Sequence, residues 1–304
     1  MSTSYTEKTH SAFHGAPIDT SDPKTLAWLI RRHGLEMTHI SRGSHIGAIF
    51  SVAEIMAVLY TRILRVDPKN PQWENRDRLI LSKGHAGASV YAALAERGFF
   101  PVEELSTHYA NGSRLSGHVS HKGVPGVEFS TGSLGHGLSV AAGMALGGKK
   151  DNADWRVYCV LGDGECEEGQ VWEAFHFAYA HKLDNLIYFI DNNGYQLDGR
   201  TADILDHGDI AKKAAGFGLY TQEIDGHDVQ AIYDAIENAC AKKGVPSCIV
   251  LDTIKGKGAT FAEPKREHSS QPGEETWQEA ISAAQQALAA CLLYTSPSPR
   301  DISG

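Results

Sequence analysis

The chain has 304 residues, 42% of them hydrophobic and 21% charged, with a formal net charge of −9 at pH 7. This composition is typical of a globular protein with ample material for a core, and no Lys/Arg-rich run indicates a nucleic-acid-binding surface. No apolar stretch is long enough to span a membrane, residues 1–22 lack the apolar core of a signal peptide, and the five cysteines have no metal-ligand spacing. We therefore expect a cytoplasmic protein.

The first part of the chain is predicted to be mainly helical. Amphipathic patterns indicate helices over residues 25–42 and 51–65, separated by the segment Gly-Ser-His-Ile-Gly at 43–47. A short strand is expected over 77–82, followed by a helix that opens at Lys-Gly-His (83–85) and runs to about residue 97. A short helix after Pro101 is weakly indicated, and the Gly-, Ser- and His-rich residues 111–132 predict an irregular segment.

The second part alternates strands and helices. After a helix rich in small residues over 135–147, apolar runs at 156–161 and 185–190 predict two buried strands joined by a helix over 167–181. Further strands are expected over 220–224 and 247–254, with a helix over 228–243 between them. The repeated alternation predicts an α/β fold with a mostly parallel sheet and helices on both faces. We expect one domain over 1–290, with its core at about 22–272.

The C-terminal residues break the pattern of the rest of the chain. An alanine-rich helix is predicted over 274–290, and Pro297 and Pro299 prevent its continuation. We interpret residues 291–304 as an aberrant tail, either an unnatural extension or a reading-frame artefact, without a part in function.

Oxygen ligands follow two neighbouring strands of the predicted β-α-β unit. Asp163 lies in Gly-Asp-Gly (162–164) after the first strand, and Asn193 follows the second. The carboxyl ends of parallel strands meet at one edge of a sheet, where open α/β sheets bind ligands, and glycines there let a bulky anion approach the backbone. Because Mg²⁺ accepts one or two protein oxygens and completes its shell with phosphate and water, the pair predicts half of a magnesium–diphosphate site.

These segments resemble the thiamine-diphosphate fingerprint, and within that superfamily they are most similar to the transketolases. The fingerprint is Gly-Asp-Gly-Glu-Cys-Glu-Glu-Gly (162–169) followed by Asp-Asn-Asn-Gly-Tyr-Gln-Leu-Asp-Gly (191–199). Other family elements occur in the same order over residues 25–272: Gly-Ser-His (43–45), Asp-Arg-Leu-Ile-Leu-Ser-Lys-Gly-His (77–85), Gly-His (117–118) and Pro-Gly-Val-Glu-Phe-Ser-Thr-Gly-Ser-Leu-Gly (125–135). The resemblance implies a thiamine-diphosphate-binding fold, of which this chain is the diphosphate-binding domain.

The resemblance also implies a role for each matching residue. Asp163, Asn193 and the backbone carbonyl of Tyr195 would bind Mg²⁺, with Ca²⁺ as an alternative. The residues implied in cofactor binding are His85 and Gly164 at the diphosphate, Gly132, Ser133 and Leu134 near the aminopyrimidine, and Glu168 and Asn193. His45, His118 and His268 would face the substrate oxygens, where imidazole can exchange protons and stabilise an oxyanion. His268 departs from the family pattern, because Ser-Ser follows it where relatives have Gly.

Glu168 and Glu173 have two interpretations. They match acidic residues that connect the paired cofactor sites across the family's dimer, and they are equally explained as a solvated helix face.

In transketolases the glutamate that activates the cofactor and most sugar-phosphate-binding residues belong to a second domain. No second β-α-β series is recognised after Pro272. The resemblance therefore implies a separately encoded N-terminal subunit of a split transketolase. Together with a C-terminal partner subunit, in a heterotetramer of two of each chain, it would transfer a two-carbon ketol unit from a ketose or ketose phosphate to an aldose or aldose phosphate.

Two alternatives remain open at the level of the sequence. The α subunit of a 2-oxo acid dehydrogenase shares Gly-Asp-Gly and Asn-Asn and also needs a partner, although the histidine series before Asp163 argues against it. A non-catalytic module that retained the fold is the other alternative.

Overall fold

The computed structural model describes residues 18–43, 45–197, 199–263, 265–266 and 268–295. Their centre is a parallel sheet of five strands in the order β1-β2-β3-β7-β6, which are Arg78–Leu81, Val157–Gly162, Leu186–Asn192, Ser247–Asp252 and Tyr220–Asp225. The central strands β2 and β3 are buried runs of apolar residues, as expected for a sheet that is covered on both faces. The predicted α/β class and strand positions are confirmed.

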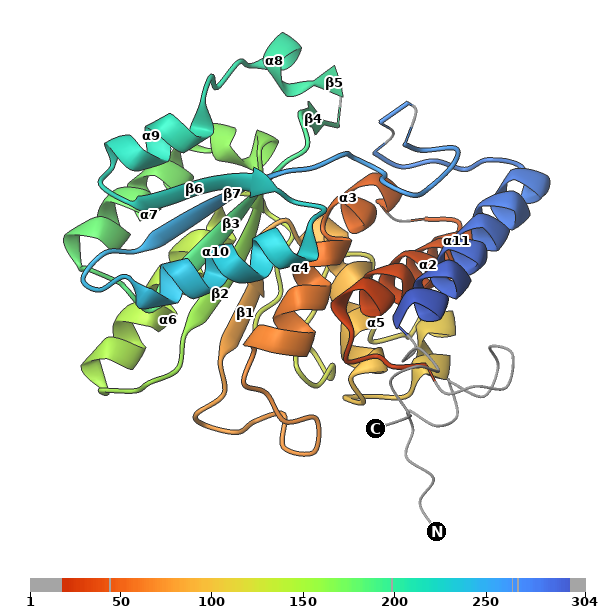
Figure 1. Ribbon diagram of the computed structural model, residues 1–304, viewed down its shortest axis with the longest axis horizontal. Coiled ribbons are helices and arrows are strands. Elements are labelled where there is room, and N and C mark those ends of the chain that lie inside the picture. The colour runs from red at the N-terminus through yellow and green to blue at the C-terminus, as the bar shows by residue number, and fades with distance from the viewer. Residues whose placement is uncertain (1–17, 44, 198, 264, 267, 296–304) are drawn as a thin grey trace, which may run out of the picture.

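Helices cover the two faces of the sheet and define two cores (Figure 1). One core packs α6 (His136–Lys150), α7 (Gly169–Ala180) and α9 (Ile210–Gly216) on strand side chains such as Cys159 and Tyr188. The opposite core packs α4 (Ala53–Val58) and α10 (Val229–Ala241) on the alternate strand residues, such as Val160 and Phe189. The alternation of successive strand side chains between two apolar cores explains why no polar residue interrupts β2.

A group of helices extends the second core away from the sheet. It consists of α2 (Pro23–Ser41), α3 (Ile46–Ser51), α5 (Gly87–Glu96) and α11 (Glu274–Thr295), and α11 packs along α2 (Figure 1). Asp22 caps α2 by accepting a hydrogen bond from the backbone N–H of Thr25 at 2.8 Å. These helices bring residues 45–47 to the end of the sheet where the strands finish.

The predicted helix over 51–65 is wrong in its bounds. Helical structure begins already at Ile46, is interrupted at Val52 between α3 and α4, and ends in a π-helical turn, η1 (Leu59–Ile63). The break coincides with a tertiary contact that the pattern does not contain, because Ser51 at the end of α3 donates a hydrogen bond to the buried Asp191 on β3 at 2.6 Å.

Several short elements were not predicted. A two-stranded hairpin, β4 (Tyr195–Gln196) and β5 (Gly199–Arg200), is followed by α8 (Thr201–Ile204), and single 3-10 turns form η2 (Gly84–Ala86) and η4 (Gly164–Glu167). The 3-10 helix η3 (Val102–Thr107) matches the weak signal after Pro101, and residues 111–132 contain neither helix nor strand, as predicted.

The last helix is longer than predicted, because α11 runs through residue 291 and ends at Thr295. The Sγ of Cys291 lies 3.8 Å from the Thr25 Oγ1, so the beginning of the predicted tail packs on α2. The part of the predicted tail after Thr295, which contains Pro297 and Pro299, lies outside the described residues. Its non-native origin and the extent of the single domain stay predictions. None of the described helices has the length and apolarity needed to cross a bilayer.

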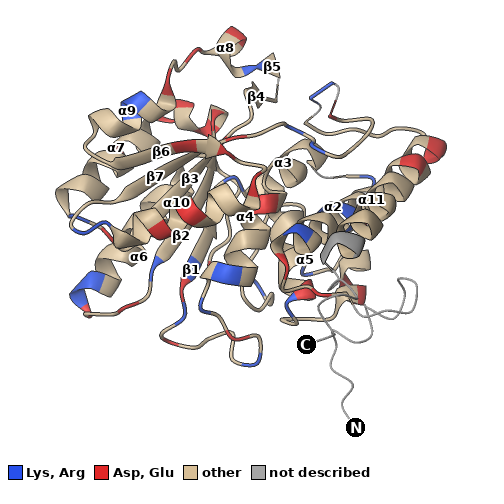
Figure 2. Cartoon of the chain, viewed as in Figure 1, with Lys and Arg blue, Asp and Glu red and all other residues tan. Residues whose placement is uncertain are grey.

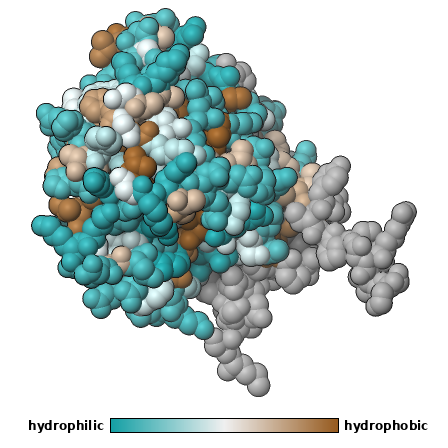
Figure 3. All heavy atoms as spheres, turned by 60° about the vertical axis from the view of Figure 1, so that its left-hand side comes forward, coloured by the Kyte–Doolittle hydropathy of each residue, from teal (hydrophilic) through white to brown (hydrophobic). Residues whose placement is uncertain are grey.

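The surface carries its charges unevenly. Figure 2 shows acidic residues where β6 and β7 end, at Asp225 and Asp252. On the side seen in Figure 3 the surface is mostly hydrophilic, with hydrophobic residues scattered across it. The exposed hydrophobic side chains near the end of the sheet belong to Leu197 and to Ile204 and Leu205, which are 67%, 45% and 56% exposed.

Candidate active site

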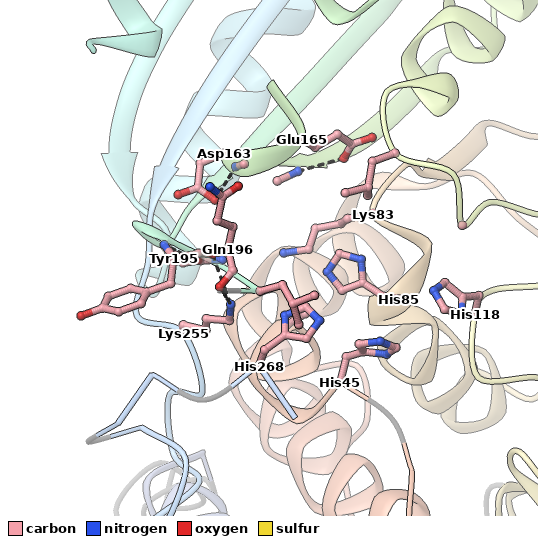
Figure 4. A pocket seen from close by; sticks show the side chains of 17 residues that line it. His45, Lys83, His85, His118, Asp163, Glu165, Tyr195, Gln196, Lys255 and His268 are labelled. Atoms are coloured by element: carbon pink, nitrogen blue, oxygen red, sulfur yellow. Dashed lines mark hydrogen bonds between the residues drawn. The ribbon is translucent and has the colours of Figure 1, made fainter. Parts of the chain in front are cut away.

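A pocket of about 270 Å³ lies at the carboxyl ends of the strands. Segments far apart in the chain meet there: the ends of β1, β2 and β3, the start of α3, and the loops at 118, 132–134, 255 and 268 (Figure 4). Ten of the twelve predicted site residues line it, namely His45, His85, His118, Gly132, Leu134, Asp163, Gly164, Asn193, Tyr195 and His268. The structure therefore brings these ten residues together in one pocket, while their roles stay predictions.

The two remaining predicted residues, Ser133 and Glu168, do not line the pocket. Both are exposed, although Gly132 and Leu134 on either side of Ser133 do line it. Glu168 packs against Gly135 at the start of α6, and Glu173 is exposed on α7. Their positions are compatible with either interpretation offered above.

Asp163 and Asn193 present oxygen atoms at adjacent strand ends. The Asp163 carboxylate accepts hydrogen bonds from the backbone N–H groups of Gly164 and Gly194 at 2.9 and 2.7 Å, and from the Thr201 hydroxyl at 3.1 Å. Its side chain is almost fully buried, so desolvation, with the charge of Asp191, raises its pKa. A carboxylate held there by three neutral donors, without a cation paired to it in the described residues, is prepared to receive one.

A buried ion pair fixes the orientation of Asn193. Its amide nitrogen donates to Asp191 at 3.0 Å, so its amide oxygen points away from Asp191, to where the backbone N–H of Tyr195 donates to it at 3.1 Å. Asp191 also accepts from Ser51, Thr253 and the ammonium group of Lys83. Burial disfavours its negative charge, but Lys83 and the hydroxyl donors outweigh that effect and lower the pKa of Asp191.

Glu165 joins three segments of the pocket wall. Its carboxylate accepts hydrogen bonds from the Ser82 hydroxyl after β1, from the Gly162 N–H at the end of β2 at 3.1 Å, and from the Gly135 N–H before α6 at 2.9 Å. Burial raises the pKa of Glu165, while these donors act in the opposite direction. The carboxylate thereby holds the end of β1 and the loop at 132–135 at a fixed distance from β2.

The carbonyl of Tyr195 faces a buried lysine. The Lys255 Nζ donates to the carbonyl oxygens of Tyr195 and Gln196, each at 3.2 Å, and the residue is only 2% exposed. Burial, together with the charge of Lys83, lowers the pKa of Lys255 to about 8. Lys83 and Lys255 thus place two amino groups in the same pocket (Figure 4).

Four histidines gather on the other side of the pocket. The ring centroid of His45 lies 5.3, 5.2 and 4.9 Å from those of His85, His118 and His268 (Figure 4). Burial and neighbouring positive groups lower the pKa of His45 to about 4 and that of His268 to about 3, and they also hold the pKa of His85 well below its usual value. These three rings are therefore neutral at pH 7 and can both donate and accept a hydrogen bond.

Glycine is required where the backbone of one loop meets another. A Cβ on Gly84 would overlap the backbone carbonyl of Thr131, and a Cβ on Gly137 would overlap Ser82. These contacts bring the loop that contains Gly132 and Leu134 directly against the end of β1. The glycines of the family motif thus serve close packing of the pocket floor as well as access for a ligand.

Sequence reasoning gave no role to four buried charged residues: Lys83, Glu165, Asp191 and Lys255. Lys83 and Glu165 stand inside the recognised motifs, and Asp191 directly precedes Asn-Asn, so their positions carried a signal. Lys255 stands outside these motifs, and its distance from Tyr195 in the sequence gives no indication of their contact.

Comparison with known proteins gives a consistent result. The family described as transketolase, thiamine diphosphate binding domain, matches residues 6–288. The chain is 44% identical to the 6-deoxy-6-sulfo-D-fructose transketolase subunit SqwG of a Clostridium species, over 84% of this chain and 93% of that protein. It is 42% identical to one of the subunits of the apulose-4-phosphate transketolase of Actinobacillus succinogenes, over 77% of this chain and 85% of that protein.

The similarity extends to solved structures of longer transketolases. The transketolase of Campylobacter jejuni superposes with a TM-score of 0.81 at 31% identity, over 88% of this chain and 45% of that one. The human transketolase is 40% identical over 82% of this chain and 40% of its own length. The chain therefore spans most of the subunit relatives and less than half of these longer proteins.

The chain belongs to the transketolase family and contains its thiamine-diphosphate-binding domain. The predictions of the fold, of thiamine diphosphate as the cofactor, and of an N-terminal subunit of a transketolase-type transferase are confirmed. The 2-oxo acid dehydrogenase alternative is not favoured, because these relatives are transketolases.

Proposed function

We propose that this chain binds the diphosphate end of the cofactor through a divalent metal and acts only together with a partner subunit that holds the aminopyrimidine end. The pair would transfer a two-carbon ketol unit between sugars, as a heterotetramer of two of each chain in the cytoplasm. The observation that carries the proposal is the pocket itself, which combines oxygen ligands, two lysines and four histidines at one sheet edge.

The donor set suits Mg²⁺ or Ca²⁺ bound together with a diphosphate. Asp163 offers a carboxylate, Asn193 an amide oxygen held in place by Asp191, and Tyr195 a backbone carbonyl. Among the described residues there is no group of three or more His, Cys, Asp or Glu side chains that could hold a metal. A site with one carboxylate and two neutral oxygens needs further oxygens, and a diphosphate would provide them.

The negative charge of the diphosphate that the metal does not neutralise would face Lys83, Lys255 and His85. Both lysines line the pocket and are 2% exposed, so their charges act there with little screening by water. Gly164 has no side chain to keep the anion from the backbone, and Gly132 and Leu134 would contact the cofactor beyond the diphosphate.

The bound cofactor would supply a nucleophilic carbon and an electron sink for breaking a carbon–carbon bond. His45, His118 and His268 would surround the substrate's oxygen atoms. A neutral imidazole donates a hydrogen bond to a developing oxyanion through one nitrogen and accepts a hydroxyl proton through the other. The Nδ1 atoms of His45 and His268 are buried and have no hydrogen-bond partner among the described residues, which leaves them available to a substrate.

The relatives suggest which sugars to test first. The subunit relatives are named for 6-deoxy-6-sulfo-D-fructose and for apulose 4-phosphate, so these ketoses are candidate donors. The test is ketol transfer to an aldose or aldose phosphate by the chain alone, by a candidate partner alone and by both, with Mg²⁺ and thiamine diphosphate. Transfer that occurs only when both chains are present supports the proposal. Full turnover by this chain without the partner would contradict the dependence on a partner.

The metal is tested separately by calorimetric binding of thiamine diphosphate. We expect Asp163→Ala to abolish the Mg²⁺-dependent part of binding, while Asp154→Ala, a change at an exposed carboxylate, leaves it intact. Unchanged partner-dependent transfer by Asp163→Ala would refute the metal site.

A further inference from the structure

Tyr109 has an unusual backbone conformation next to the histidine cluster. Its φ angle is 59°, in the left-handed region that non-glycine residues rarely adopt. Its backbone N–H donates to the Leu115 carbonyl at 2.7 Å, and its side chain is 57% exposed. Because the side chain is exposed, burial in a hydrophobic core does not explain this unfavourable backbone conformation. The contacts of the ring have to explain it.

The ring of Tyr109 lies between two glycines that precede histidines proposed to contact the substrate. A Cβ on Gly43 would lie 2.8 Å from its Cε1, and a Cβ on Gly117 would lie 2.7 Å from its Cε2. The two glycines therefore touch opposite edges of the same ring. Gly43 stands two residues before His45 and Gly117 directly before His118. Neither glycine has a positive φ angle, so space for the ring is the reason for glycine at both positions.

The backbone of the His118 loop is held by hydrogen bonds to the Tyr91 hydroxyl. The Tyr91 hydroxyl donates to the His118 carbonyl at 3.1 Å and accepts from the Ser120 N–H at 2.9 Å. The buried ring of His108 lies between Tyr91 and Tyr109, with centroids 6.1 Å from each. Tyr109 is thus the outer member of an aromatic series that supports the His118 loop and separates it from the His45 loop.

We propose that Tyr109 is a positioning residue of the active site, whose ring sets the spacing between the loops of His45 and His118. The ring centroids of the two imidazoles lie 5.2 Å apart, and both rings would contact one substrate. A shift of one loop therefore changes the position of one imidazole relative to that substrate. The proposal rests on the proposed function for the catalytic roles of the two histidines. Its structural part, the coupling of the two loops through the ring, can be measured on this chain alone.

The first measurement is the NMR signals of the His45 and His118 rings in the isolated chain, assigned through His45→Gln and His118→Gln. We expect Tyr109→Ala and Gly117→Ala each to shift both ring signals, since one removes the ring and the other pushes against it. Tyr109→Phe should leave the signals nearly unchanged. In the Tyr109→Ala, Gly117→Ala double variant the new methyl group meets no ring, so it should add no further shift. Simple addition of the two single effects would overturn the proposal.

The second measurement is ketol transfer by the variants with the partner subunit. We expect Tyr109→Ala to lower kcat/KM about 10- to 100-fold, mainly through kcat, and Tyr109→Phe to restore it to within about threefold. Tyr179→Ala is the matched control, because Tyr179 is 48% exposed and also packs on a glycine, Gly218, but lies on α7 outside the pocket. An equal loss in that control would overturn the proposal.

The two measurements keep failures distinguishable. Absence of transfer by the wild-type pair would count against the proposed function, while the NMR signals would still decide whether Tyr109 couples the two loops. Should Tyr109→Ala fail to fold, Gly117→Ala carries the test, because it leaves the ring in place.

Discussion

Replacing Asp191 by asparagine is expected to destabilise the chain strongly and to weaken metal binding. The Asp191 carboxylate is fully buried and accepts hydrogen bonds from Lys83, Ser51, Thr253 and Asn193. Asparagine has nearly the same shape but no charge, and its NH₂ group would face at least one donor. The ammonium group of Lys83, which is 2% exposed, would lose its counter-ion.

The size of this effect follows from the burial of Lys83. Removing one partner of a buried ion pair costs about 3–5 kcal/mol, because the remaining charge stays desolvated. We therefore expect the free energy of unfolding to fall by about 3–5 kcal/mol and Tm to fall by about 5–8 °C.

Urea unfolding of the isolated chain measures the loss. Asp154→Asn is the control, because it breaks an ion pair with Arg65 in which the aspartate side chain is 75% exposed, and it should leave the midpoint of unfolding nearly unchanged. Combining Asp191→Asn with Lys83→Met removes the unpaired charge and should recover part of the stability. A loss below about 1 kcal/mol in Asp191→Asn, or a double variant less stable than the single one, would refute the reasoning.

The pKa values of three histidines and the packing of two glycines give further predictions. Because the pKa values of His45 and His268 are lowered to about 4 and 3, the unfolded chain takes up protons first on acidification. Stability should therefore fall from about pH 6.5 towards pH 4, and replacing both by Gln should flatten this fall in urea unfolding. His33 is the opposite case: burial disfavours its charge, but Glu36 and Glu96 outweigh burial and raise its pKa to about 9. Its contribution is complete below about pH 6.5 and is lost as the pH rises through 9, so an unchanged alkaline slope in His33→Gln would contradict this account. Gly84→Ala should abolish cofactor binding in calorimetry, since its methyl group overlaps a backbone carbonyl, whereas Gly143→Ala in the open middle of α6 should raise stability by about 0.5–1 kcal/mol. Equal behaviour of the two alanine variants would contradict the packing argument.

Local signals were sufficient for the elements with one dominant pattern. The apolar runs of β2 and β3 and the glycine-bounded start of α6 lie within a few residues of their predicted positions. The helix after residue 46 was misplaced because its break at Val52 accompanies a contact of Ser51 with β3. The β4–β5 hairpin and α8 were missed because each is only two to four residues long and lacks a periodic pattern.

The sequence by itself determined the family, the sheet and the edge at which the site lies, because motifs and hydrophobic periodicity are local properties of the chain. Tertiary structure alone decided how the site is held together. Asp191 selects the orientation of Asn193, Lys255 reaches the Tyr195 carbonyl, and the Tyr109 ring separates two histidine loops. The last two contacts join residues that are distant in the chain, and the orientation of Asn193 depends on a buried network that includes Lys83 and Ser51. Such contacts depend on which side chains are buried together and on their orientation, and the spacing of residues along the chain does not reveal either.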